Sequence, residues 1–329
     1  MLLLSMTCCF CSAQKKGAVW CFGDSALVDF SNTSSITTGT SLVKSRVSCS
    51  SISYSSGSLL FYSSYDPSGM IAGTDPVKAY NFNHVVIMNG DSMKGGGWYH
   101  EIVIIPYPGS DSLYYLFYIG VTLDYGLWYS IIDMTANGGS GAVIQKNIQL
   151  QSFQMVDCLT AIKHGNGRDW WIIFRRWNSS PAAPNNEYHS YLVTPAGIIN
   201  YTVQHVGSIQ STGFGNLVFN QSGNEFIYTN PQGLMEKCDF DRCTGIISNP
   251  KTIYPEQTFP FSRYFWGGQY SSSDSIFYTT TIPLYVQDTS RLLQFDLTAA
   301  NIVSSTDTLW ETPFMKTMGQ LKLAADGKI

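Results

Sequence analysis

The chain has 329 residues and a formal net charge of −4 at pH 7, and only 13% of its residues are charged. It has no cluster of Lys and Arg, so it lacks the basic surface that nucleic acids and acidic membranes attract. Much of the remainder is Ser, Thr, Asn, Gly and aromatic residues, a mixture that favours β-sheets with many turns over helices.

The first 13 residues are predicted to be a signal peptide. An apolar stretch ends in the small residues Ser12 and Ala13, which permit cleavage before Gln14. The stretch lacks the usual basic residues in front of it, so the alternatives are a start further upstream or a segment that is not a signal. No later run of 18 apolar residues occurs, and no membrane span is expected. We therefore expect residues 14–329 to be secreted, either extracellular or on the outer cell surface.

A glycine- or serine-rich turn followed by a burst of aromatic and aliphatic residues recurs along the chain. Successive copies lie roughly 50 to 58 residues apart, which is the spacing expected when each repeat is one multi-stranded propeller blade. The copies occupy residues 55–62, 108–115, 165–172, 221–228, 272–278 and 324–329.

A second element alternates with these turns. It is a strand that is expected toward the outside of its blade and that ends in Asp or Thr. The side chains of these residues accept hydrogen bonds from the backbone just ahead. One unit is therefore an inner strand, a glycine turn, an aromatic strand, a loop, a third strand with a polar turn, and an outer strand. The polar-ended strands occupy residues 26–30, 129–135, 191–197, 238–245 and 293–298.

The two periods together predict an all-β fold, a single β-propeller of six or seven blades. One polar-ended strand precedes the first glycine turn, and the last glycine turn has no outer strand after it. The N-terminal strands are thus expected to complete the blade that the C-terminus begins, which closes the ring and removes exposed sheet edges. Because the sixth copy stops at Ile329, we expect a truncated last blade and a monomeric domain of a longer chain.

Several motifs resemble a known family. They include VWCFG at 19–23, LVDF at 27–30, KHGNGRDWW at 163–171, FDRCTG at 240–245 and ADGKI at 325–329. Together they resemble the N-terminal propeller of large secreted Bacteroidetes proteins, which carry PKD-type repeats and a type IX secretion sorting tail. The resemblance spans nearly all of residues 14–329 and implies an exported propeller, similar to YVTN and WD-type modules, with no settled activity. The PKD repeats and the sorting tail are absent from this sequence.

Two ligand-binding candidates lie in the third turn. The repeat places His164 at the end of an inner strand and Arg168 on the turn itself, where either side chain could contact a ligand at a propeller face. The alternative is structural. Asn166 and Gly167 would form a tight hairpin turn, and Arg168 and Asp169 would be solvated.

Two tryptophans are the other ligand-binding candidates. Trp177 and Trp266 belong to the segments 177–188 and 255–266, which are rich in aromatic residues, Pro and Asn. Aromatic rings give contact area at low entropic cost, so the expected partner is an unidentified surface protein or a glycan. No catalytic residue, metal ligand or cofactor is predicted, because the five histidines are scattered and no nucleophile elbow occurs.

Five cysteines remain after removal of the predicted signal. Cys238 and Cys243 are close enough in sequence to form a disulfide across a strand-to-turn junction, and an exported protein would retain it. Free buried thiols and metal ligation are the alternatives.

The leading functional hypothesis is a noncatalytic protein or glycan interaction module. The rivals are a propeller hydrolase or lactonase with a metal in its channel, and a structural spacer. Convergence of three or more carboxylate or His side chains at one channel mouth would favour the enzyme.

Overall fold

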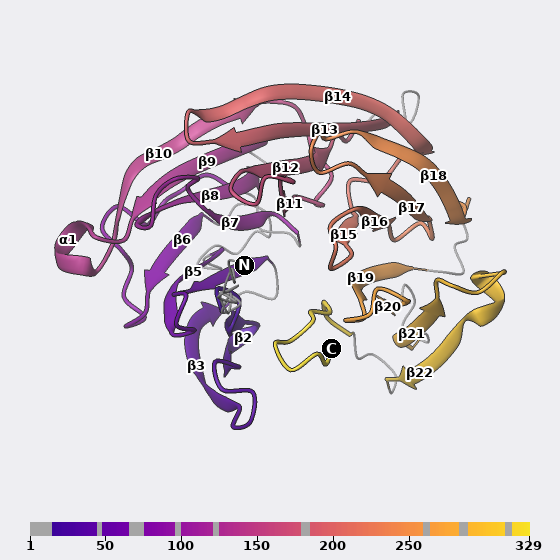
Figure 1. Cartoon of the computed structure of the whole chain (residues 1–329), viewed down its shortest axis with the longest axis horizontal. Coiled ribbons are helices and arrows are strands. Elements are labelled where there is room, and N and C mark those ends of the chain that lie inside the picture. Colours follow the sequence, from indigo (N-terminus) through magenta and orange to yellow (C-terminus); the bar gives the residue numbers. More distant parts are fainter. Residues whose placement is uncertain are drawn as a thin grey trace, which may run out of the picture.

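In the computed structural model, six antiparallel sheets stand around a common centre (Figure 1). The structure describes residues 15–44, 48–65, 76–95, 100–120, 125–178, 185–258, 264–282, 289–312 and 318–329. In these ranges helical structure is limited to α1 (Ala136–Gly139) and the 3-10 turn η1 (Val303–Ser305). The predicted all-β propeller is confirmed. The sequence left six or seven blades open, and the described residues form six sheets, one for each blade. The predicted signal peptide lies outside the described residues.

Four blades have four strands each, which run from the centre of the ring outward in chain order (Figure 1). The third blade is β7 (Ile102–Pro106), β8 (Leu113–Gly120), β9 (Gly126–Asp133) and β10 (Ala142–Gln151). The fourth is β11 (Thr160–Lys163), β12 (Trp170–Arg175), β13 (Asn185–Thr194) and β14 (Gly197–Gln210). The fifth is β15 (Asn216–Phe219), β16 (Glu225–Thr229), β17 (Met235–Phe240) and β18 (Ile247–Tyr254). The sixth is β19 (Phe265–Tyr270), β20 (Ile276–Thr281), β21 (Arg291–Asp296) and β22 (Asp307–Glu311).

The first two blades show three strands each in the described ranges. The first is β1 (Val19–Phe22), β2 (Asp24–Asp29) and β3 (Thr37–Lys44). The second is β4 (Cys49–Ser53), β5 (Leu59–Tyr65) and β6 (Val77–Asn81).

The six predicted glycine turns are all formed, and they share one hydrogen-bond pattern. In the fifth blade Asn220 N donates to Glu225 O at 2.9 Å, and Gly223 N donates back to Asn220 O at 3.0 Å. One residue in each turn has a left-handed φ, which is glycine in five turns and Asp274 (φ 60°) in the sixth blade. This backbone requirement explains why the turns were visible in the sequence.

The aromatic strand after each turn forms the core between neighbouring blades. In β8 the residues Leu116, Phe117, Tyr118 and Ile119 are all fully buried. Leu116 and Tyr118 pack in one hydrophobic cluster with the second blade, whereas Phe117 and Ile119 pack in another with the fourth. Because each such strand is covered on both faces, it is continuously apolar and does not alternate.

The polar turns are also formed. Each follows the third strand of a four-stranded blade and leads into the fourth, outermost strand. The Asp133 carboxylate accepts a hydrogen bond from Thr135 N at 2.8 Å, and Asp241 and Asp296 do the same for the residue two places ahead, also at 2.8 Å. Hydrogen bonds to these carboxylates lower the pKa of all three. The largest contribution comes from the Thr135 side chain for Asp133, from Cys243 N for Asp241 and from the Thr298 side chain for Asp296.

The lowered pKa values predict a loss of stability in acid. An Asp whose native pKa lies below its unfolded value of about 3.9 stabilises the fold above that pH, and the contribution disappears as pH falls through the native pKa. Replacing Asp133, Asp241 and Asp296 together by Asn keeps the turn-forming side chain and removes the titration. Between pH 5 and pH 2 the wild-type melting temperature should fall more steeply than that of the triple variant. Parallel curves would contradict this assignment.

The C-terminal segment, residues 318–329, closes the ring between the last blade and the first (Figure 1). Thr280 Oγ1 in β20 donates to Gly319 O at 3.0 Å, and Lys322 Nζ lies 4.9 Å from the centre of the Trp20 ring in β1. The predicted closure by the N-terminal strands is therefore observed.

Candidate functional site

The four predicted ligand-binding residues lie at two different ends of the inner strands. His164 directly follows β11, and Arg168 is in the glycine turn that joins β11 to β12. Trp177 follows β12, which runs back to the opposite end, and Trp266 is near the start of β19. The structure thus separates the His164 and Arg168 pair from the two tryptophans.

At the glycine-turn end, His164 joins two blades. Its Nδ1 accepts a hydrogen bond from Asn166 N at 3.0 Å, so the neutral ring carries its proton on Nε2, which lies 3.0 Å from Cys243 O. Beside it, Gly165 N donates to Arg242 O at 3.0 Å. Nδ1 is therefore engaged within its own turn, and Nε2 fastens the fourth blade to the fifth.

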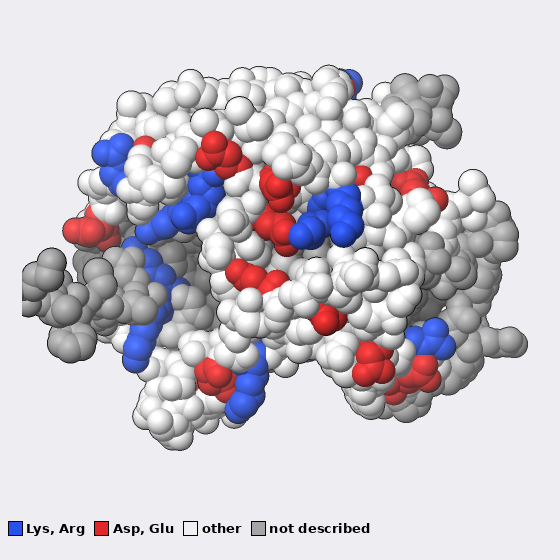
Figure 2. Space-filling model, turned by 45° about the vertical axis from the view of Figure 1, so that its right-hand side comes forward, with Lys and Arg blue, Asp and Glu red and all other residues white. Residues whose placement is uncertain are grey.

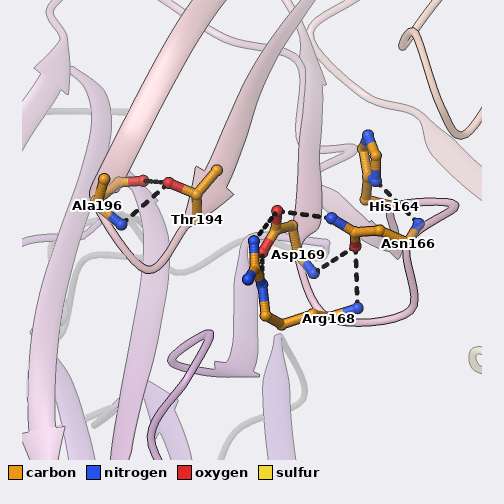
Figure 3. A network of polar contacts seen from close by, with 7 residues as sticks. His164, Asn166, Arg168, Asp169, Thr194 and Ala196 are labelled. Atoms are coloured by element: carbon orange, nitrogen blue, oxygen red, sulfur yellow. Dashed lines mark hydrogen bonds and ion pairs between the residues drawn. The ribbon is translucent and has the colours of Figure 1, made fainter.

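Arg168 is held by its own turn (Figure 3). Its Nε and Nη2 atoms lie 2.7 and 3.1 Å from the two carboxylate oxygens of Asp169, and Asn166 Nδ2 donates to the same carboxylate at 2.8 Å. These bonds, that from Arg168 first, lower the pKa of Asp169. The expectation that Asp169 is solvated is wrong, since it is buried and satisfied inside the turn. Figure 3 shows the neighbouring Thr194 and Ala196 turn as a separate pair. The structural interpretation of this turn therefore accounts for its polar groups.

At the other end, hydrogen bonds tie the starts of two inner strands to the next blade. Ser48 Oγ accepts from Glu101 N and from Ile102 N, both at 3.0 Å, which joins the second blade to the third. Asp157 Oδ1 accepts from Gly215 N at 2.8 Å, which joins the fourth to the fifth. These bonds fix the positions of the residues at the channel mouth.

A shallow hollow with room for about one water molecule opens at this end. Most of its lining lies at or just before the starts of β7, β11, β15 and β19, so four blades contribute to it. Three aromatic rings and a proline supply its apolar walls. Burial lowers the pKa of its histidine to about 4, so this side chain is neutral at neutral pH. The lining residues are His100, Asp157, Phe214, Gly215, Pro231, Phe265 and Trp266.

A group of hydrogen-bonded polar side chains lies next to Pro231, the lining residue between β16 and β17. Ser211 Oγ lies 3.0 Å from Gln232 Oε1 and 2.7 Å from Glu256 Oε1, and Asn230 Nδ2 lies 3.2 Å from the other oxygen of Glu256. Trp177 lies beside this group and donates from Nε1 to Ser211 O at 3.2 Å. Hydroxyl, amide and carboxylate groups are therefore adjacent in the chain to Pro231, a lining residue of the hollow.

Of the residues at this candidate site, Trp177 and Trp266 were predicted individually, and Glu256 and Phe265 lie in the predicted segment 255–266. His100, Asp157 and Phe214 come from different blades, and no local motif marks them. The available signal was their place in the repeat, just ahead of each inner strand.

The proposed Cys238–Cys243 disulfide is not formed. Both thiols are free in the structure. Cys238 points into the core of the fifth blade, where burial raises its pKa to about 12, while Cys243 is exposed on the turn beside His164. The strand end therefore directs the two side chains into different environments.

Charged groups are sparse on the surface. On the face in Figure 2, acidic and basic side chains form small groups on a mostly uncharged surface. Among the described residues, no three His, Cys, Asp or Glu side chains gather closely enough to hold a metal ion. In the same ranges no helix is long and apolar enough to cross a membrane.

The fold defines the chain as a six-bladed β-propeller, and several solved structures are similar to it in overall fold. A protein from Bacteroides uniformis assigned as a 6-phosphogluconolactonase matches with a TM-score of 0.58 at 11% identity, over 92% of this chain and 82% of that one. Hydrazine synthase from Kuenenia stuttgartiensis matches with a TM-score of 0.54 at 14% identity, over 96% and 89%. The periplasmic gluconolactonase PpgL from Pseudomonas aeruginosa matches with a TM-score of 0.51 at 12% identity, over 92% and 82%.

At these identities the similarity concerns the fold alone. No protein-family model matches the chain. No curated protein matches it significantly in sequence.

Proposed function

We propose that this chain is an exported β-propeller that binds a protein or glycan without catalysis, through the hollow beside Trp266. The observation that supports the proposal is the aromatic hollow to which four blades contribute. The hydrogen-bonded group of Ser211, Gln232 and Glu256 lies next to its lining residue Pro231. An apolar floor with a few convergent polar groups is typical of ligand sites. A sugar ring offers an apolar face and several hydroxyls, so a glycan suits this surface, and a Tyr- or Trp-containing protein segment is the other ligand to test.

The proposed location is the outer surface of the cell or the medium. It is supported by the predicted signal at residues 1–13 and by the resemblance to propellers of secreted Bacteroidetes proteins. In that setting the propeller would be one module of a longer surface protein, with adhesion-type repeats supplied elsewhere.

Binding by the chain without residues 1–13 tests the proposal. On a glycan array and in a pull-down of cell-surface proteins, the wild type should retain a defined ligand. Trp266→Ala should weaken that binding by about tenfold or more, because a buried aromatic contact is worth at least about 1–2 kcal/mol. Trp310→Ala is the matched control, since this tryptophan is 60% exposed on the outer strand β22.

Two outcomes would count against the module. Absence of any ligand in both assays would favour a structural spacer. Equal weakening by Trp266→Ala and Trp310→Ala would indicate nonspecific adhesion to exposed aromatic surface.

A lactonase is the second candidate, supported by the fold shared with two lactonases. Its test is hydrolysis of gluconolactone and 6-phosphogluconolactone in the presence of Ca²⁺, Mg²⁺ or Zn²⁺. We expect no rate above the uncatalysed reaction. Turnover that Asp157→Asn abolishes would establish the enzyme instead.

A further inference from the structure

The N-terminal strand β1 lies directly against β4, the inner strand of the second blade. Val19 N donates to Ser53 Oγ at 3.1 Å, and Ser51 Oγ donates to Val19 O at 2.7 Å. Further back along the chain, Ser53 N donates to Lys16 O at 2.8 Å. The residue numbers rise along one segment as they fall along the other, so β1 runs antiparallel to β4.

This register places two cysteines opposite each other. Side chains two residues apart lie on the same face of a strand. Cys21 is two residues after Val19 in β1, and Cys49 is two residues before Ser51 in β4, so each cysteine shares a face with a residue of the contact. The serine side chains of β4 reach the backbone of β1, and Cys49 extends from β4 on the same side. A disulfide needs Cα atoms about 4.4–6.8 Å apart. The serine hydroxyls of β4 reach the β1 backbone at 2.7 and 3.1 Å, so the two strands are in direct contact here.

The surroundings of the two thiols agree with this placement. Cys21 is 3% exposed and belongs to a hydrophobic cluster with Val43 and Tyr62, and Cys49 packs against the same cluster. Burial, with a further contribution from the nearby Cys49 thiol, raises the pKa of Cys21 to about 12. Both thiols are free in the structure, and the two side chains lie close to each other between the first and second blades.

We propose that Cys21 and Cys49 form a disulfide between the first two blades when the chain folds in an oxidising environment. The oxidant is a small-molecule disulfide such as oxidised glutathione. One S–S bond forms between the protein sulfurs, the S–S bond of the oxidant breaks, and the two thiol protons end on the two glutathione thiols that are released.

The bond forms during folding, before the pocket closes. A buried thiol with a raised pKa is a poor nucleophile, because the thiolate is the attacking species. Once formed, the bond encloses a loop of roughly 30 residues and stabilises the first blade by restricting the unfolded chain. The proposal is independent of what the hollow binds.

Peptide mapping of the full chain tests the proposal. The reduced, denatured protein is refolded in a buffer of reduced and oxidised glutathione, free thiols are blocked with iodoacetamide, and the digest is analysed by mass spectrometry. We expect a linked peptide pair that contains Cys21 and Cys49 and separates on reduction. The oxidised protein should also melt several degrees above the reduced protein. Cys49→Ala should remove this difference, and Cys158→Ala, a buried cysteine of the fourth blade, should keep it.

Blocked Cys21 and Cys49 thiols in the refolded wild type would overturn the proposal. A link from either one to another cysteine, including Cys8, Cys9 or Cys11, would overturn it as well. Because the mapping uses the wild-type chain and no ligand, its result is independent of variant folding and of the binding assays.

Discussion

Arg175→Ala should lower the free energy of unfolding by about 3–5 kcal/mol, the range seen when a buried charged group is truncated. Arg175 is fully buried at the seam between the fourth and fifth blades. Its guanidinium carbon lies 4.4 Å from the ring centres of both Tyr188 in β13 and Tyr228 in β16. Each desolvated cation–π contact is worth up to about 2 kcal/mol, and alanine would also leave a cavity between the two rings. Urea denaturation followed by circular dichroism measures the loss.

Two further variants separate charge from volume. Arg175→Met fills most of the space without a charge, so it should cost less than alanine if packing dominates. Arg291→Ala removes an arginine that is 51% exposed and pairs with the equally exposed Glu311, so it should change the unfolding midpoint little. A small effect of Arg175→Ala, equal to that of Arg291→Ala, would show that the seam does not depend on this side chain.

Gly126→Ala should cost about 3 kcal/mol or more, through the backbone. Gly126 begins β9 with φ +120°, and a Cβ built there would lie 1.8 Å from Gln151 O and 3.0 Å from Ser152 Cα. Because both neighbours are backbone atoms of the adjoining strand end, the clash requires β9 and β10 to separate locally. The change should therefore lower the melting temperature of the whole propeller, measured by differential scanning calorimetry.

Gly138→Ala is the matched control for the glycine. Its φ is +64°, but nothing lies within 4 Å of the added Cβ, so only the left-handed strain of about 1–2 kcal/mol remains. Equal costs for the two substitutions would mean that the close approach at Gln151 contributes nothing.

The architecture could be predicted from the sequence because its determinants are local. The turn at Asn220–Glu225 needs a residue with left-handed φ, and the turn at Asp241 needs a side chain that bonds the backbone two residues ahead. Such requirements repeat in each blade and are visible as a period. The buried strands, such as β8, carry their apolar residues as continuous runs, and these were also predicted.

The site could be predicted only in part, because it is assembled by ring closure. His100, Asp157, Phe214 and Trp266 are separated by about 50 residues or more each and meet only where the inner strands of different blades converge. Trp266 was predicted because an aromatic residue at the end of a loop suggests binding by itself, and the structure places it in β19. His164 was chosen on the same kind of reasoning, but its ring is occupied by Cys243 O and Asn166 N, which the sequence could not show.

Hydrogen exchange in the presence of the bound ligand tests the central claim most directly. Amide exchange is measured with and without the oligosaccharide or surface protein that binds best in the assays above. Binding in the hollow predicts slower exchange at residues 214–215 and 265–267 and unchanged exchange in the turn at 164–169. Protection confined to the 164–169 turn or to the outer strands, with none around the hollow, would contradict the claim that this propeller binds at the starts of its inner strands.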